Sequence, residues 1–195
     1  TWGGQRNGGT SFDFTYYYGV VPKDAMEKLA WIASDIIGFV INTVDEQTLE
    51  GEKQVVKNEK RQRVDNQPYG HGRGIILKAL YPKGHPYSWS VIGDLEDLQA
   101  ATVDDVKEFY KEFYGPSNMT VVIAGDIKID ETKKMVERWF GEIKPSSNVS
   151  ADPKPQPVSL SESKNLFHLD KFAKLPDLSI VFPTVEEYHP DAYAL

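Results

Sequence analysis

The order of strand-like and helix-like segments is the feature that most constrains this fold. Residues 10–21 are rich in β-branched and aromatic side chains, which predicts a strand. Apolar residues then recur at helical spacing from Met26 to Val40, which predicts a strongly amphipathic helix packed on a sheet. Further helices are predicted at about 45–63, 74–82, 102–114 and 130–143, and further strands at 118–126, 165–172 and 177–183.

These segments mix without a regular strand–helix–strand alternation. The expected fold class is therefore α+β, with a mostly antiparallel sheet covered by helices on one face. Local signals support two of the helix ends. Thr102 is a good N-cap with Asp105 three residues later, and Gly141 is a typical helix stop. At the carboxyl end, "HPDAYAL" resembles the start of another helix.

Composition excludes several classes of function. The chain has 195 residues and a formal net charge of −7, and it has no strongly basic patch, so nucleic acid is not an expected partner. No apolar run approaches the roughly 18 residues that a membrane span requires. The chain has no cysteine, which removes disulfides and thiolate chemistry but leaves the cellular compartment open.

Two glutamates are unusual in the helix predicted after residue 45. Glu52 and Glu59 are seven residues apart, so they project from one face, and that face coincides with an apolar stripe through Leu49 and Val56. Periodicity alone favours a solvated helix with many charges. The alternative is an inward-facing polar site, where a metal or a basic partner would compensate buried carboxylates.

Other motifs of catalysis are weak or absent. The four histidines include no pair at i,i+3 or i,i+4, so the chain contains no helical pair of metal ligands and no complete zinc site. There is no G-x-S-x-G elbow and no phosphate-binding loop. The glycines before residue 10 favour a hairpin or a strand entry, and polar Thr10, Asp13 and Thr15 on an edge strand could receive an extended peptide.

Taken in order, these stretches resemble the pitrilysin/insulinase family of zinc peptidases, which carries an inverted H-x-x-E-H motif. The segment "GGQRNGGTSFDFTYYYGVVP" is similar to the family pattern G-x-x-N-A-x-T-x-x-D-x-T-x-Y, with Gly8 where Ala is usual. The segment "EGEKQVVKNEKRQRVDNQP" resembles the family helix E-x-x-x-V-x-x-E. "HPYSWSVIGDLEDLQAATVDDVKEFYKEFYGPSNMTVVIAGD" and "VERWFGEI" resemble the stretches that follow.

The resemblance implies roles for individual residues. Glu59 is expected to be the third zinc ligand, and Glu52 the second acidic residue that helps to orient or polarise the catalytic site. Asn7 is expected to contact the backbone of a peptide substrate bound as an added strand, and Thr10 is expected to belong to the same substrate site. The cofactor is expected to be Zn²⁺, whose bound water would hydrolyse the peptide bond.

The H-x-x-E-H segment is absent from these 195 residues. The resemblance therefore implies a fragment that is inactive by itself and not expected to bind zinc, with residues 1–145 a truncated metallopeptidase-type domain. Residues 146–195 would be a Pro/Ser-rich connection and the first strands of a following homologous region.

Three functional hypotheses remain. The full-length parent is a zinc metallopeptidase that cleaves peptides or unfolded polypeptides, with a second homologous domain or subunit as partner. Alternatively, it is a non-catalytic structural or partner subunit of the same family. A helix-on-sheet binding module is the third hypothesis, but it gives no account of Glu52 and Glu59.

Overall fold

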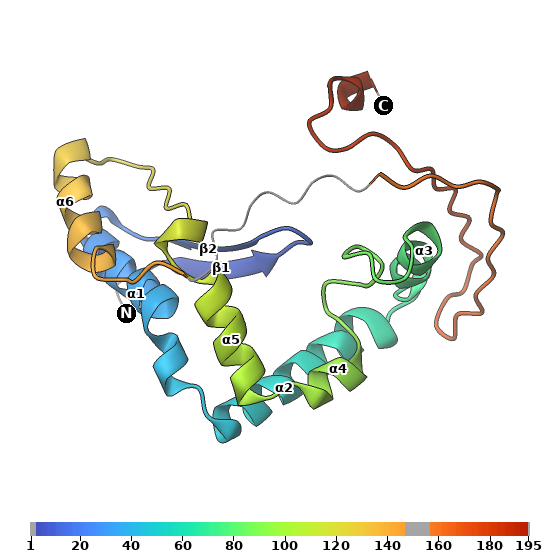
Figure 1. The fold of residues 1–195 in the computed structure, drawn as a ribbon, viewed down its shortest axis with the longest axis horizontal. Coiled ribbons are helices and arrows are strands. Elements are labelled where there is room, and N and C mark those ends of the chain that lie inside the picture. The colour runs from blue at the N-terminus through green and yellow to red at the C-terminus, as the bar shows by residue number, and fades with distance from the viewer. Residues whose placement is uncertain (1–2, 147–156, 195) are drawn as a thin grey trace. The chain divides into compact units, whose positions relative to one another are not determined.

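A computed structural model describes residues 3–146 and 157–194 (Figure 1). The strands are β1 (Gln5–Thr10) and β2 (Thr15–Val20). The α-helices are α1 (Met26–Gly38), α2 (Glu46–Lys60), α3 (Gly72–Leu80), α4 (Leu95–Ala100), α5 (Val103–Phe113) and α6 (Ile129–Phe140). Short 3-10 turns occupy Lys23–Ala25, Val40–Thr43, Pro116–Asn118 and Pro190–Ala194, and a π-helical turn occupies Arg61–Asp65.

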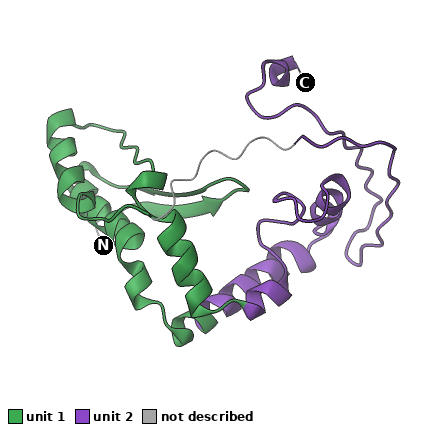
Figure 2. Cartoon of the chain, in the orientation of Figure 1, with its two compact units in different colours: residues 1–50, 101–152 green, residues 51–100, 153–195 purple. Residues whose placement is uncertain are grey.

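The chain forms two compact units, which are coloured separately in Figure 2. The first unit contains residues 1–50 and 101–152, and the second contains residues 51–100 and 153–195. Both units are discontinuous in sequence, because the chain leaves the first within α2 and returns to it before α5. The predicted division at residue 145 stays a prediction.

The first unit is built on a β-hairpin. Strands β1 and β2 pair in antiparallel register from Gln5 opposite Val20 to Thr10 opposite Thr15. Helix α1 packs closely on this hairpin, because a Cβ atom at Gly19 would lie 2.6 Å from the Leu29 side chain. Glycine at that position therefore lets the helix approach the strand.

Helix α5 joins this unit through tyrosines. The Tyr110 hydroxyl donates to the carbonyls of Ile36 and Ile37 near the end of α1. The Tyr114 ring stacks on Tyr110 with ring centroids 4.6 Å apart, and its hydroxyl is 2.8 Å from that of Tyr17 on β2. This tyrosine cluster connects the hairpin, α5 and α1 across a large sequence separation.

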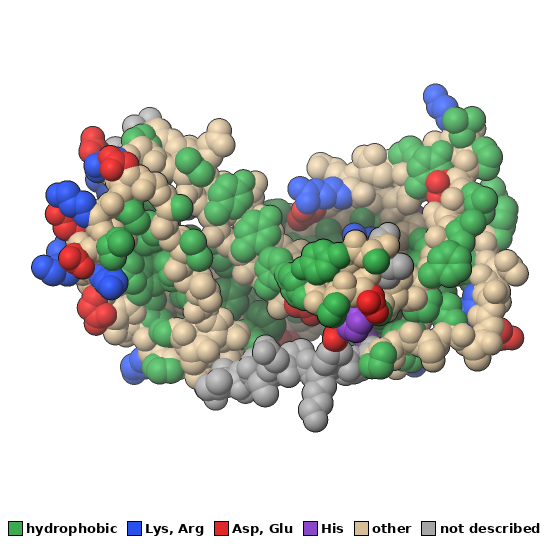
Figure 3. Space-filling view, turned by 90° about the horizontal axis from the view of Figure 1, so that it is seen from above, with side chains coloured by type: hydrophobic (Ala, Val, Ile, Leu, Met, Phe, Trp, Pro, Cys, Tyr) green, Lys and Arg blue, Asp and Glu red, His purple; other side chains and the backbone are tan. Residues whose placement is uncertain are grey.

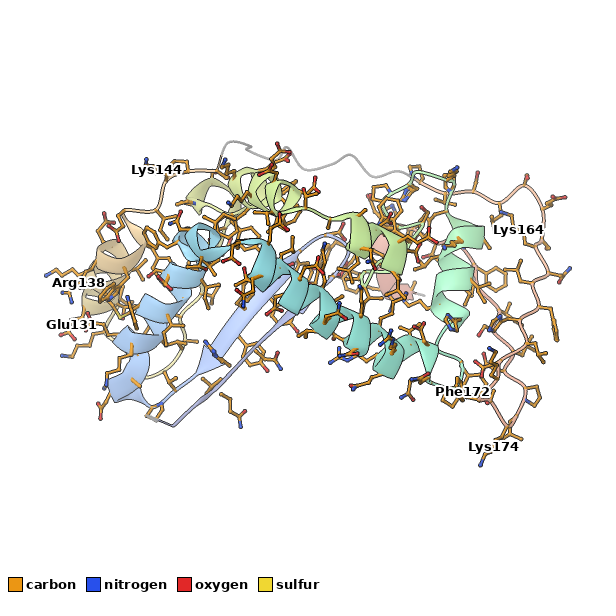
Figure 4. The ribbon with its side chains drawn as sticks, turned by 90° about the horizontal axis from the view of Figure 1, so that it is seen from below. Glu131, Arg138, Lys144, Lys164, Phe172 and Lys174 are labelled. Atoms are coloured by element: carbon orange, nitrogen blue, oxygen red, sulfur yellow. The ribbon has the colours of Figure 1, made fainter. Side chains whose placement is uncertain are left out.

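Helix α6 packs beside α1, as Figure 1 shows. Buried Met135 and Ile143 contribute to the apolar contact, and a Cβ atom at Gly38 would meet the Ile143 side chain at 2.9 Å. At the edge of the contact, Arg138 and Trp139 both donate to the Glu27 carboxylate. Figure 4 labels Arg138 where it projects from α6.

The second unit joins the rest of α2 to α3, α4 and the carboxyl-terminal segment. The Asp170 carboxylate accepts from the backbone N–H of Tyr69 at 2.9 Å, and the Tyr69 hydroxyl donates to the Leu175 carbonyl at 2.9 Å. Lys164, labelled in Figure 4, donates to the Ala79 carbonyl at 2.6 Å. These polar contacts hold an extended segment that has few buried apolar side chains of its own.

The α+β class is confirmed, and five of the predicted helical segments are helices in the structure. The α5 capping box is present, with Thr102 and Asp105 bonded reciprocally, and Gly141 follows the last residue of α6. The helix start expected at the carboxyl end is a 3-10 turn, Pro190–Ala194. Sequence patterns missed the six-residue α4 and the glycine-containing β1, since short elements give little periodicity.

The strands predicted at 118–126, 165–172 and 177–183 are wrong for this structure, which shows them without strand hydrogen bonding. Among the described residues, only β1 and β2 form a sheet. A strand needs a neighbour to satisfy its backbone groups, and these segments have none within the described chain. Most of the predicted Pro/Ser connection, residues 147–156, lies outside the described residues.

Candidate functional site

Helix α2 carries the two candidate acidic residues. Its start is determined by Asp45, whose carboxylate accepts from the Thr48 backbone N–H at 2.8 Å, while the Thr48 hydroxyl accepts from the Asp45 N–H. The backbone hydrogen bond from Thr48, followed by its hydroxyl, lowers the pKa of Asp45. A capped start and a run of strong helix formers explain why this highly charged segment is helical.

The face of α2 that contacts residues 93–100 carries lysines rather than glutamates, and Lys53 is the buried residue of this helix. Lys53 is only 6% exposed, and its ammonium donates to the Gln99 carbonyl at 3.2 Å, near the end of α4. Lys57 donates to the Gln99 side chain at 3.0 Å, and Lys60 donates to the Gly93 carbonyl at 3.0 Å. Lys53 and Lys57 thus place positive charge at the carboxyl end of α4, which is the negative end of a helix, whereas Lys60 contacts the chain before α4 begins.

Glu52 and Glu59 lie on a different side of α2 from this lysine face. Glu52 is exposed, and the Glu59 side chain is 39% exposed. The expectation that both acids face inward is therefore wrong within this chain. Successive helix positions are turned by about 100°, so the step from Lys53 to Glu52 moves from the buried face to the solvent.

Glu59 has a partner that the sequence interpretation missed. Arg63 Nη1 lies 2.8 Å from Glu59 Oε1 in an i,i+4 pair, a spacing that is readable in the sequence. The π-helical turn Arg61–Asp65 begins two residues after Glu59, and turns of this type are frequent at functional sites. The arginine is 77% exposed, so the pair is weak and the carboxylate is open to another cation.

The hairpin carries the candidate substrate residues. Asn7 lies opposite Tyr18, and Thr10 lies opposite Thr15, whose hydroxyl donates to it at 3.3 Å. Both Asn7 and Thr10 are exposed. Since side chains alternate along a strand, Asn7 and Thr10 project from opposite faces of β1.

Asn7 shares its face with exposed aromatic rings. Tyr16 and Tyr18 on the neighbouring strand are stacked with centroids 6.2 Å apart, and Phe14 is 6.1 Å from Tyr16. A Cβ atom at Gly9 would lie 2.8 Å or less from Tyr16 ring and hydroxyl atoms, so glycine makes room for this ring. An extended peptide bound on this face would contact the Asn7 amide and the neighbouring tyrosine rings.

Metal ligands do not assemble within the described part of the chain. Residues 3–146 and 157–194 contain no group of three His, Asp or Glu side chains placed to hold a metal ion. Glu59 would supply one oxygen ligand, whereas zinc in catalytic sites has three protein ligands. No described helix is both long and apolar enough to span a bilayer.

Comparisons with known proteins agree with the ordered motifs. Residues 100–195 match the family model described as "Peptidase M16 inactive domain". A zinc protease of Helicobacter pylori, PqqE, is 32% identical over 142 residues, which is 73% of this chain and 31% of that protein. The uncharacterised zinc protease YmxG of Bacillus subtilis is 28% identical over 99% of this chain and 45% of its own length.

A solved structure of a protease has a similar fold. The crystal structure of a protease from Helicobacter pylori superposes with a TM-score of 0.72 and 30% identity, covering 81% of this chain and 37% of that one. The fold and the ordered motifs are those of an α+β metallopeptidase-type domain. The chain belongs to peptidase family M16, the pitrilysin/insulinase family, and it spans about one third to one half of the length of these relatives.

Proposed function

We propose that the protein to which these 195 residues belong is a zinc-dependent peptidase that hydrolyses peptides or unfolded polypeptides. The observation that carries this proposal is the pair of carboxylates on one solvent-accessible side of α2, Glu52 and Glu59. By resemblance to the family pattern E-x-x-x-V-x-x-E, they correspond to the acidic residues of its metal site. Relatives named as zinc proteases support the reaction class.

Glu59 is the proposed metal ligand, and Glu52 the proposed outer acidic residue. The described residues do not complete a zinc site, so the proposal requires two further ligands from an H-x-x-E-H segment outside this chain. Before metal binding, Arg63 would hold the Glu59 carboxylate in place. A metal ion would then displace the arginine, because the exposed ion pair is weak.

The proposed substrate site is the Asn7 face of the hairpin. A peptide would pair through main-chain hydrogen bonds with the edge of β1 that has no partner strand among the described residues. The Asn7 amide would contact the peptide backbone, and the neighbouring tyrosines would contact its side chains. Thr10 projects from the other face of the strand, so its proposed contribution is through its backbone at the edge.

A second candidate function is a non-catalytic family subunit. The description of the matching family model, an inactive domain over residues 100–195, favours it specifically. A relative from Schizosaccharomyces pombe carries the name "Probable mitochondrial-processing peptidase subunit beta", and the word subunit fits a protein that works with a homologous partner domain or subunit.

The test uses the whole protein with the substitution Glu59→Gln. We expect zinc content to fall well below one equivalent and cleavage of an unfolded polypeptide to fall at least about 100-fold, because a neutral amide is a poor zinc ligand. Glu52→Gln should retain zinc and lose about 10- to 100-fold in activity. Metal analysis and peptide cleavage are the two measurements.

Glu46→Gln is the matched control, because it removes an acid from the first turn of the same helix and should change neither measurement. Full zinc and full cleavage in the Glu59→Gln protein would reject the ligand role. A wild-type protein that lacks both zinc and peptidase activity would support the non-catalytic subunit instead.

A further inference from the structure

A pocket lies between α1 and α6, in the first unit. Its volume is about 270 Å³. Three of its lining side chains are aromatic and two are carboxylates; the full set is Trp31, Ser34, Asp35, Phe39, Trp139 and Glu142. All six belong to the described part of the chain, and none has a place in the proposed peptidase chemistry.

One aromatic wall of the pocket is held in place. The Trp139 indole N–H donates to Glu27 Oε1 at 3.2 Å, and the same oxygen accepts from Arg138. The hydrogen bond to Glu27 orients the Trp139 ring, and the Arg138 guanidinium is paired with the same Glu27 carboxylate. The Ser34 hydroxyl is buried and donates to the Trp31 carbonyl of the same helix at 2.8 Å. The aromatic rings and the carboxylates are therefore the groups available to bind a ligand.

The two carboxylates of the pocket have no cationic partner in the part of the chain that the structure describes. Among the described residues, neither Asp35 nor Glu142 forms a side-chain hydrogen bond or an ion pair, and both are exposed. Trp31 is also 49% exposed, so its indole ring is accessible from solvent. The pocket thus combines negative charge with accessible aromatic surface.

We propose that this pocket binds the cationic side chain of a basic residue, Arg or Lys, presented by a partner polypeptide. A guanidinium or ammonium group is attracted to the face of an indole ring, and Trp is the most favourable ring for this contact. The carboxylates supply charge-assisted hydrogen bonds to the same group. A neutral apolar ligand would instead desolvate both carboxylates without compensation.

The proposal does not depend on the peptidase function. The net charge of −7 favours association with basic segments at low salt. A single exposed site of this kind gives weak binding, with a dissociation constant on the order of 1 mM for one basic residue. Several basic residues on one partner, or further contacts around the pocket, would be needed for tighter binding.

The test follows the indole N–H signals of the 195-residue chain by NMR during titration with the peptide acetyl-Ala-Arg-Ala-amide. The neutral control is the same peptide with citrulline, which keeps the shape of arginine and removes its charge. We expect saturable shifts of the Trp31 and Trp139 signals with the arginine peptide, and little change of Trp89. The double variant Asp35→Asn/Glu142→Gln should weaken binding at least about tenfold.

The matched charge control is Asp130→Asn/Glu137→Gln, which removes two exposed acids of α6 that do not line the pocket. This variant should bind within about twofold of wild type. Equal shifts with the citrulline peptide, or equal weakening by both double variants, would overturn the proposal. Binding of guanidinium ion as tight as that of the peptide would reject a polypeptide partner and indicate a small cation.

Discussion

At the residue scale, polar side chains rather than large apolar ones determine much of this structure. Within residues 3–146 and 157–194, the buried hydrophobic residues are few: Ala25, Ala30, Leu77, Met135 and Ile143. Buried Lys53 donates a hydrogen bond to the Gln99 carbonyl near the end of α4, and the Asp170 carboxylate accepts one from the Tyr69 backbone N–H. Individual hydrogen bonds therefore matter more here than in a chain with a large core.

Tyr110 provides a pH-dependent prediction at this scale. Burial, and then the charges of Tyr17 and Asp35, raises the pKa of Tyr110 from 10.0 to about 12. The unfolded chain loses this proton first, so the stabilisation is complete below about pH 10 and is lost as the pH rises through about 12. Urea unfolding between pH 8 and pH 11.5 should show falling stability above pH 10.

The control is Tyr110→Phe, whose free energy of unfolding should depend less steeply on alkaline pH. This variant should be less stable than wild type at pH 8, because the Ile36 and Ile37 carbonyls lose their hydrogen-bond donor. Substitution of exposed Tyr193 by Phe should leave the wild-type slope. An unchanged slope in the Tyr110→Phe protein would show that another group controls the alkaline transition.

At the element scale, helix starts are determined by local side chains, whereas helix faces are determined by packing. Thr102 caps α5 as its sequence context predicts, and Asp45 caps the start of α2 in the structure. In contrast, the face of α2 that packs on α4 is the lysine face. The packing of α2 on the six-residue helix α4 determines which face of α2 is covered. The periodicity of apolar residues within α2 does not predict that face.

Thr102→Ala tests the capping box of α5. The Thr102 hydroxyl accepts from the Asp105 N–H at 3.2 Å, and the Asp105 carboxylate accepts from the Thr102 N–H at 2.8 Å. We expect a loss of about 1 kcal/mol in the free energy of unfolding, measured by urea denaturation. Thr184→Ala, at an exposed position outside any helix, should be within about 0.5 kcal/mol of wild type. A loss as large in that control would show that the cap is not the cause.

At the scale of the whole molecule, the chain exposes an unusual amount of apolar surface. Val122 is 83% exposed, Phe167 is 91% exposed and Leu178 is 85% exposed, all in segments that were predicted to be strands. Figure 3 shows hydrophobic side chains gathered on the surface of the molecule. Exposed apolar surface on this scale marks a site of association or aggregation.

This exposure predicts different behaviour for the chain alone and for the whole protein. The 195-residue chain should bind the dye ANS strongly, and the whole protein should bind several-fold less per molecule, because partner strands would cover the apolar segments. Fluorescence titration measures both. Val122→Ser should destabilise the whole protein by about 1–3 kcal/mol and lower ANS binding by the isolated chain. Equal ANS binding by the two proteins would contradict this account.

The sequence was sufficient for much of the local structure and for the family. The positions of five helices, the Thr102 cap and the stop at Gly141 follow from residue types within a few positions of each other. The irregular order of strand-like and helix-like segments was sufficient for the α+β class, and the ordered motifs around Asn7, Glu52 and Glu59 were sufficient for the M16 family. The roles of these residues stay proposals.

Only the tertiary structure decided which side chains share a face and which strands have partners. It placed Lys53 inward and Glu52 outward, separated Asn7 and Thr10 onto opposite faces of β1, and left the segment around Val122 without strand hydrogen bonds. The physical reason is that caps and helical propensity act over a few residues, whereas burial and strand pairing depend on neighbours that are distant in sequence.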